Sequence, residues 1–133
     1  MKKISIISLL AILLASCASP TPTPNPAGNT RPALTDPAQP IEVQAGEMIH
    51  IVVDSNPSTG YHWEIIGPLD DAHLEFVSRE YVGSEPALPG SGGVEVWTFK
   101  AVAPGESILV LGNYPPSESE SYEEEVRFSI VVE

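Results

Sequence analysis

The sequence from Ile41 onward predicts an all-β domain, an immunoglobulin-like β-sandwich of about seven strands. Seven short segments carry apolar residues at alternate positions, or in short continuous runs, which is the pattern of strands. Glycine, proline and other turn-forming residues separate these segments at roughly the 8 to 14 residue spacing of sandwich folds. No window of about ten residues in this part of the chain shows the apolar stripe of a helix.

The expected strands follow one another in order along the chain. They are the segments 41–45, 49–53, 61–66, 74–82, 94–101, 108–111 and 126–132. The alternation slips within 74–82, which predicts a β-bulge in that strand. The segment 108–111 is almost entirely apolar, as expected for a central strand. Trp63 and Trp97 lie on strands and are expected in the core.

A tight, exposed loop is expected between the second and third strands, at Asn56, Pro57, Ser58, Thr59 and Gly60. Pro57 fixes its own φ and favours an extended Asn56, whereas Gly60 permits a backbone angle that a side chain would resist. Ser58 and Thr59 therefore lie on a stiff loop. Such a loop suits a rigid binding surface, because little conformational entropy is lost when a partner binds.

Strand counting places three loops at the same end of the sandwich. If successive strands run mostly antiparallel, the chain leaves the first loop along 61–66 and returns along 74–82. It then leaves along 94–102 and returns along 107–112. The first loop, a second at 83–93 and a third at 113–121 therefore share one end, as the binding loops of antibody domains do.

The residues of these three loops resemble the chagasin-type family of cysteine-peptidase inhibitors. The stretch NPSTGYHW, from Asn56 to Trp63, is similar to the family's Asn-Pro-Thr-Thr-Gly-Tyr-x-Trp loop. The family's Gly-x-Gly-Gly loop has its counterpart in Gly90, Ser91, Gly92 and Gly93. The family's third mark, Arg-Pro-Trp, is replaced by Tyr114, Pro115 and Pro116, so only the proline remains. The resemblance spans residues 41–133.

The resemblance implies reversible, non-covalent inhibition of papain-like cysteine peptidases by a wedge of three loops. In that arrangement Asn56, Pro57, Ser58, Thr59 and Gly60 cover the catalytic cysteine of the peptidase. Gly90, Ser91, Gly92 and Gly93 lie along its substrate-binding side, and Tyr114, Pro115 and Pro116 occupy the other side. Arg and Trp often anchor interfaces, so their loss from the third loop predicts weaker or differently selective inhibition.

Two alternatives stay open at this point. The chain is either such an inhibitor or a non-inhibitory, surface-tethered immunoglobulin-like module that binds another protein. Tyr114 is either an exposed contact residue or a ring that packs against the rim of the sandwich.

The N-terminus predicts export and a lipid anchor. Lys2 and Lys3 precede an apolar run at 4–14, which is too short to span a bilayer, and small residues precede Cys17. This stretch resembles a bacterial lipoprotein signal at 1–16, with cleavage before Cys17 and acylation of that cysteine. An ordinary signal with a chance cysteine is the alternative. The proline-rich stretch 17–40 is expected to be a disordered tether to the cell envelope, before a domain at 41–133.

The composition argues against several kinds of partner. The formal net charge is −12, which disfavours nucleic acid. Five carboxylates fall close together, at Glu118, Glu120, Glu123, Glu124 and Glu125. They are interpreted as a solvated segment, as a steering surface for a basic partner or, least well, as a calcium site, since the spacing of a calcium loop is missing.

The sequence gives no sign of catalysis or of a cofactor. It has none of the common metal, phosphate or dinucleotide motifs, and its three histidines show no ligand spacing. Cys17 is the only cysteine, so the predicted domain has neither a thiol nucleophile nor a disulfide. A monomer that is not an enzyme, with no metal, is therefore expected.

Overall fold

The computed structural model describes residues 32–117 and 120–133. Within them it has seven strands and one short 3-10 turn, which confirms the predicted fold class. The elements are β1 (Ile41–Val43), β2 (Met48–Ser55), η1 (Pro57–Thr59), β3 (His62–Ile65), β4 (Leu74–Gly83), β5 (Gly93–Ala101), β6 (Gly105–Tyr114) and β7 (Glu124–Val132). The predicted signal at 1–16, Cys17, most of the predicted tether and Glu118 lie outside the described residues.

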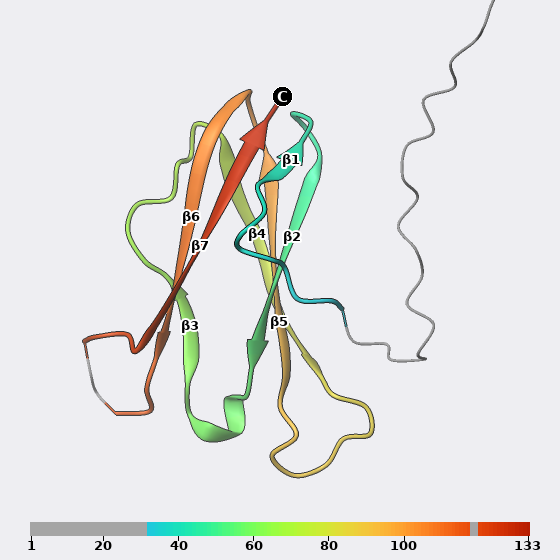
Figure 1. Ribbon diagram of the computed structural model, residues 1–133, viewed down its shortest axis with the longest axis vertical. Helices are drawn as coiled ribbons and strands as arrows, with labels where there is room; N and C mark the ends of the chain where they lie inside the picture. Colours follow the sequence, from blue (N-terminus) through green and yellow to red (C-terminus); the bar gives the residue numbers. More distant parts are fainter. Residues whose placement is uncertain (1–31, 118–119) are drawn as a thin grey trace, which may run out of the picture.

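The strands form two sheets that pack face to face as a sandwich (Figure 1). One sheet has the order β1-β7-β6-β3, and the other has the order β2-β5-β4. Neighbouring strands are antiparallel except for β1, which runs parallel to β7 and pairs only with Ile130, Val131 and Val132. This exception lies outside the part of the chain that forms the three loops.

All seven strands differ in their bounds from the predicted segments, by one to several residues, and β1 and β6 illustrate the causes. β1 ends at Val43, because the chain turns through Gly46, whose φ is 94°. β6 extends beyond the apolar segment 108–111 at both ends, from Gly105 to Tyr114. Its outer residues pair with β7 from Gly105 opposite Val132 to Asn113 opposite Glu124, so the backbone ladder sets the length of this strand.

The predicted bulge in the fourth strand is confirmed. The register of β4 against β5 shifts between Phe76 and Ser78, so that Val77 has no counterpart on β5. Because side chains alternate between the two faces of a strand, one extra residue moves the following side chains to the opposite face. Arg79 is thereby paired with Trp97 and lies on the core side of the sheet.

The inner faces of the two sheets meet in one hydrophobic core. Trp63 is 5% exposed and Trp97 is 3% exposed, which confirms that both belong to this core. The largest fully buried side chains around them are Ile51, Leu74, Phe99, Leu109, Leu111, Phe128 and Ile130. The indole Nε1 of Trp63, on β3, donates a hydrogen bond of 2.8 Å to the carbonyl oxygen of Asp54, on β2. This bond ties the two sheets together next to the first loop.

The strand directions bring three loops to one end of the sandwich, as strand counting predicts. They are the connections between β2 and β3, between β4 and β5, and between β6 and β7, at the lower end of Figure 1. We call them loop 1 (residues 56–61), loop 2 (residues 84–92) and loop 3 (residues 115–123, described except for 118 and 119).

The segment before β1 contacts the edge of the other sheet. The backbone N–H of Thr35 donates to the carbonyl oxygen of Val52, and the N–H of Val52 donates to Oγ1 of Thr35, each at 2.9 Å. The last part of the predicted tether therefore touches the sandwich on β2. Among residues 32–117 and 120–133, no helix has the length and apolar character needed to cross a membrane.

A small polar cluster lies at the end of the sandwich opposite the three loops. Oδ2 of Asp70 accepts a hydrogen bond from Nδ1 of His73 at 2.8 Å and another from the hydroxyl of Ser107 at 3.3 Å. The hydrogen bond with His73 is the main cause that lowers the pKa of the Asp70 carboxyl below its usual value.

The lowered pKa of Asp70 predicts sensitivity of the fold to acid. A carboxyl whose pKa is lower in the folded state stabilises the fold above its unfolded-state pKa of about 3.9, and this contribution is lost as the pH falls through the folded-state value. Asp70→Asn is therefore expected to lower the melting temperature at pH 7. The melting temperature of this variant should also decrease less than that of the unchanged protein as the pH falls below 4. Thermal melts from pH 7 to pH 3 test this, and parallel curves for both proteins would contradict it.

Candidate functional site

Loop 1 is a single 3-10 turn that its own sequence stabilises. Pro57 is the first residue of this turn, where a missing N–H costs nothing. The N–H of Thr59 donates to the carbonyl oxygen of Asn56 at 3.1 Å, and the N–H of Gly60 donates to that of Pro57 at 3.0 Å. Gly60 ends the turn with a φ of 84°, a left-handed conformation that favours glycine.

Side-chain hydrogen bonds stiffen the same loop. The hydroxyl of Ser58 donates to Oδ1 of Asn56 at 2.6 Å, and Oγ1 of Thr59 donates to the carbonyl oxygen of Asn56 at 2.7 Å. Pro57, Ser58, Thr59 and Gly60 are nevertheless all exposed. Loop 1 thus presents its residues to solvent on a backbone that is already ordered, as the sequence predicts.

Loop 2 is attached to loop 1 through Asn56. The side-chain Nδ2 of Asn56 donates to the carbonyl oxygen of Gly90 at 3.2 Å. Gly92 has a φ of 67°, and a Cβ at this position would lie 3.2 Å from the carbonyl oxygen of Ser55 and 3.3 Å from Cβ of Asn56. Glycine at residue 92 therefore lets the backbone of loop 2 lie directly against the start of loop 1.

Loop 2 is closed by its own hydrogen bonds and exposes a large apolar residue. Ser84 donates its N–H to the carbonyl oxygen of Gly92, and Ser91 donates its N–H to that of Leu88, each at 3.0 Å. Leu88 is 63% exposed. The sequence-based reasoning did not single it out, although an apolar residue between two prolines in a predicted loop is a usable signal.

Loop 3 meets loop 1 through Pro116. A Cβ on Gly60 would lie 2.6 Å from Cβ of Pro116, so glycine at residue 60 is what allows the two loops to touch. Pro115 is buried, whereas Pro116 is exposed. Loop 1 therefore contacts both of the other loops, loop 2 through Asn56 and loop 3 through Gly60.

The ring of Tyr114, at the end of β6, packs against its neighbours. It is stacked on His62, with ring centroids 5.7 Å apart, and makes an edge contact of 6.0 Å with Tyr122. Tyr114 is half-buried. Of the two interpretations that the sequence left open, these contacts favour the ring packed against the rim.

Two glutamates at the junction of loop 3 and β7, Glu123 and Glu125, are held by hydrogen bonds. Glu123 accepts a hydrogen bond of 2.7 Å from the hydroxyl of Tyr61, which raises the pKa of that tyrosine. Hydrogen bonds from Tyr122 and Arg127 lower the pKa of the Glu125 carboxyl. In the described part of the chain, no three His, Cys, Asp or Glu side chains are placed to hold a metal ion together.

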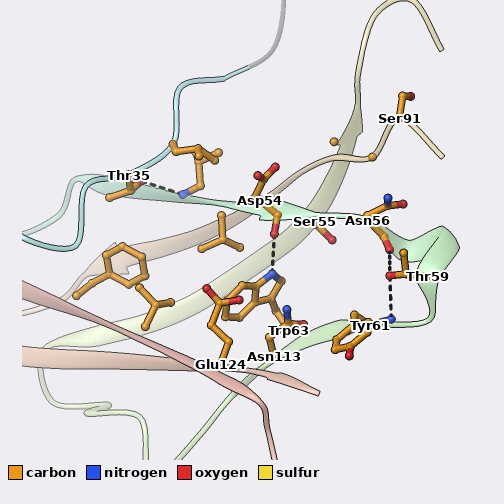
Figure 2. Close-up of a pocket in the computed structure, with 17 residues that line it drawn as sticks. Thr35, Asp54, Ser55, Asn56, Thr59, Tyr61, Trp63, Ser91, Asn113 and Glu124 are labelled. Atoms are coloured by element: carbon orange, nitrogen blue, oxygen red, sulfur yellow. Dashed lines mark hydrogen bonds between the residues drawn. The ribbon is translucent and has the colours of Figure 1, made fainter. Parts of the chain in front are cut away.

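A cavity of about 660 Å³ extends from loops 1 and 2 along the side of the sandwich (Figure 2). It runs between β2 and β7, and the indole of Trp63 lies in its wall, bonded to Asp54. Asn113 and Glu124 lie beside that indole in Figure 2, and Thr35 closes the far end of the cavity. The cavity is thus continuous with the loop surface.

The three loops together make a rigid surface at one end of a sandwich, with loop 1 joined to both of its neighbours. A sequence profile of the chagasin family peptidase inhibitors, family I42, matches residues 42–132. The chain belongs to the chagasin family. The predicted family of cysteine-peptidase inhibitors is confirmed, and so is the expectation that the chain is an inhibitor rather than an enzyme.

Solved structures similar to this chagasin-family chain share its sandwich. The cysteine protease inhibitor EhICP2 of Entamoeba histolytica is 20% identical with a TM-score of 0.55, covering 70% of this chain and 84% of its own. Amebosin is 26% identical with a TM-score of 0.55, covering 70% and 87%. The Leishmania mexicana protein ICP is 29% identical with a TM-score of 0.50, covering 71% and 89%. No curated protein sequence is significantly similar to the chain.

Proposed function

We propose that this chagasin-family protein inhibits papain-like cysteine peptidases reversibly, by inserting loops 1, 2 and 3 into the active-site cleft. The observation that carries the proposal is the attachment of loop 1 to both neighbours, through Asn56 to Gly90 and through Gly60 to Pro116. Because the three loops are ordered before a partner arrives, binding costs little conformational entropy.

Each loop has a separate part in the proposed inhibition. Loop 1, with Ser58 and Thr59 exposed at its tip, covers the catalytic cysteine of the peptidase. Gly90, Ser91, Gly92 and Gly93 bring the backbone of loop 2 close to the substrate-binding side, where the exposed Leu88 adds an apolar contact. Of the third-loop residues, the exposed Pro116 and the half-buried Tyr114 face the other side of the cleft, while the buried Pro115 supports them from behind. The loops act by occlusion, and no bond to the inhibitor is formed or broken.

We further propose that the protein is exported, acylated on Cys17 and held by residues 17–40 to the bacterial cell envelope, as a monomer. The sequence at 1–17 supports the anchor. A proline-rich segment of this length extends by about 3.1 Å per residue, so it would hold the inhibitor well away from the membrane.

A second candidate function is a binding module that has kept the sandwich without the inhibition. The packing of Tyr114 on His62 favours it, because this ring is partly withdrawn from the surface where the resemblance places an anchor residue. Such a module would bind its partner through another surface, so changes at the tip of loop 1 would not affect it.

Thr59→Trp distinguishes the two functions. Thr59 is exposed at the tip of loop 1, and an indole there is too wide for a narrow cleft. We expect the substitution to raise the inhibition constant of the full chain against papain by about 100-fold, equivalent to ~2.7 kcal/mol. Steady-state inhibition measures the change, and melting temperatures show that the variant is folded.

The matched control is Thr59→Ser, which keeps the hydroxyl that donates to Asn56 and is expected to inhibit as the unchanged protein does. A folded, unchanged chain that leaves papain and a cathepsin L-like peptidase fully active at micromolar concentration would contradict the proposed inhibition. It would leave the binding module as the better explanation.

A further inference from the structure

Four polar side chains form a connected network directly behind loops 1 and 2. They are Ser55 on β2, Glu64 on β3, Arg79 on β4 and Glu95 on β5. We call this set the four-strand brace. Loop 1 connects β2 to β3 and loop 2 connects β4 to β5, so the brace holds one residue from every strand that carries these loops.

Glu95 is the centre of the brace and is 4% exposed. On β5 it precedes Trp97 by two residues and Phe99 by four, so its side chain lies with theirs on the core face of the sheet. One carboxylate oxygen accepts a hydrogen bond of 2.8 Å from the hydroxyl of Ser55, and the other accepts one of 2.7 Å from Nε of Arg79. Without such partners, burying a carboxylate at this depth would strongly raise the free energy of the folded state.

Arg79 connects the network to Glu64 on β3, the edge strand of the four-stranded sheet. Its guanidinium carbon lies 4.6 Å from the centre of the Trp97 ring, and its Nη1 lies 3.5 Å from Oε1 of Glu64. The planar guanidinium is thus fixed by a ring, a buried carboxylate and a half-exposed carboxylate at once. The bulge in β4 places Arg79 on this face of the sheet.

The brace acts on the loops through Ser55. Ser55 immediately precedes Asn56, whose side chain holds Gly90 of loop 2. The carbonyl oxygen of Ser55 also lies against Gly92, where a Cβ would approach it to 3.2 Å. A displacement of Ser55 would therefore shift both loops relative to each other.

We propose that the four-strand brace sets the relative position of loops 1 and 2, and that Glu95 is a positioning residue for inhibition. This inference rests on the proposed function. Buried ion pairs can often be replaced by apolar residues without loss of stability, but they limit the arrangements that a site can adopt. The brace therefore contributes to the geometry of the inhibitory surface more than to the stability of the fold.

The test compares three variants of the full chain. It separates an effect on the relative position of loops 1 and 2 from an effect on the stability of the fold. The triple variant S55A/R79M/E95L replaces three of the four brace residues with apolar side chains of similar size and leaves the half-exposed Glu64 in place. Glu95→Gln keeps the shape but removes the charge that binds Arg79. Asp70→Asn is the matched control, because it breaks a carboxylate network at the opposite end of the sandwich.

Inhibition of papain, melting temperature and amide hydrogen exchange are measured for each variant. The amides of Thr59, Gly60 and Ser91 are the probes, since each donates a hydrogen bond within loop 1 or loop 2. We expect the triple variant to melt within about 5 °C of the unchanged protein, while its inhibition constant rises about tenfold or more and the three amides exchange faster.

Equal inhibition and unchanged exchange in a stable triple variant would overturn the proposal. If the triple variant does not fold, Glu95→Gln decides the question against Asp70→Asn. Weaker inhibition by Glu95→Gln alone supports the brace, and equal inhibition by both variants overturns it. The exchange rates do not depend on a peptidase, so the brace remains testable even if the unchanged chain fails to inhibit papain.

Discussion

Gly60→Ala is expected to raise the inhibition constant by about 100-fold, equivalent to ~2.7 kcal/mol, because it disturbs a surface that is ordered before binding. The new Cβ would lie 2.6 Å from Cβ of Pro116, a distance that real Cβ atoms essentially never show. Loops 1 and 3 would have to separate. Steady-state inhibition of papain measures the loss.

Gly46→Ala is the matched control for this substitution. Gly46 has a φ of 94°, close to the 84° of Gly60, but nothing lies within 4 Å of the position that its Cβ would take. Both variants bear about 1–2 kcal/mol of left-handed strain, and Gly46 lies at the end of the sandwich away from the loops. Similar inhibition by the two variants would show that contact between loops 1 and 3 is unimportant.

Trp63→Ala is expected to cost about 3–5 kcal/mol of stability, which is a large part of the total for a domain of this size. The side chain is almost fully buried, and its removal leaves a cavity directly behind loop 1. The melting temperature should fall by roughly 10 °C or more. Urea unfolding gives the free energy directly.

Trp63→Phe separates burial from hydrogen bonding at the same position. Phenylalanine keeps most of the apolar contact but cannot donate to the carbonyl oxygen of Asp54. The loss of this one bond is expected to cost about 1–3 kcal/mol, less than the alanine substitution. Equal losses for the two variants would mean that the bond between the sheets, rather than packing, determines the stability of this region.

Much of the fold follows from local rules, which is why the sequence predicts it. Alternation of apolar residues marks the strands, and the slip in alternation within 74–82 marks the bulge between Phe76 and Ser78. Strand counting then brings the three loops together. The parallel pairing of β1 with β7 could not be predicted in this way, because it joins segments about 90 residues apart and leaves no local pattern.

The contacts that join the loops could not be predicted from the sequence either, because they also link segments that are far apart in the chain. The bond from Asn56 to Gly90 extends the pairing of β2 with β5, and the approach of Gly60 to Pro116 extends the pairing of β3 with β6, so both depend on strand registers between distant segments. The motifs single out the three loops at this end of the sandwich, but nothing in them says which residues touch. The stacking of Tyr114 on His62 is likewise a contact across two strands.

Glu95 is a case in which the sequence carried a signal that is easy to pass over. It stands at the same phase as Trp97 and Phe99, so strict alternation places it inside the sandwich. A charged residue at a core position indicates a buried network. Only the structure identifies its partners, because Ser55 and Arg79 come from other strands.

The contact of Thr35 with β2 determines where a mechanical pull on the N-terminal side enters the domain. The load reaches β2 at Val52 first, through two hydrogen bonds that can open independently of the core. When these bonds open, the segment between Thr35 and β1 can extend before any force acts on the pairing of β1 with β7. The shape of the three loops is thereby insulated from movement of the chain before Thr35.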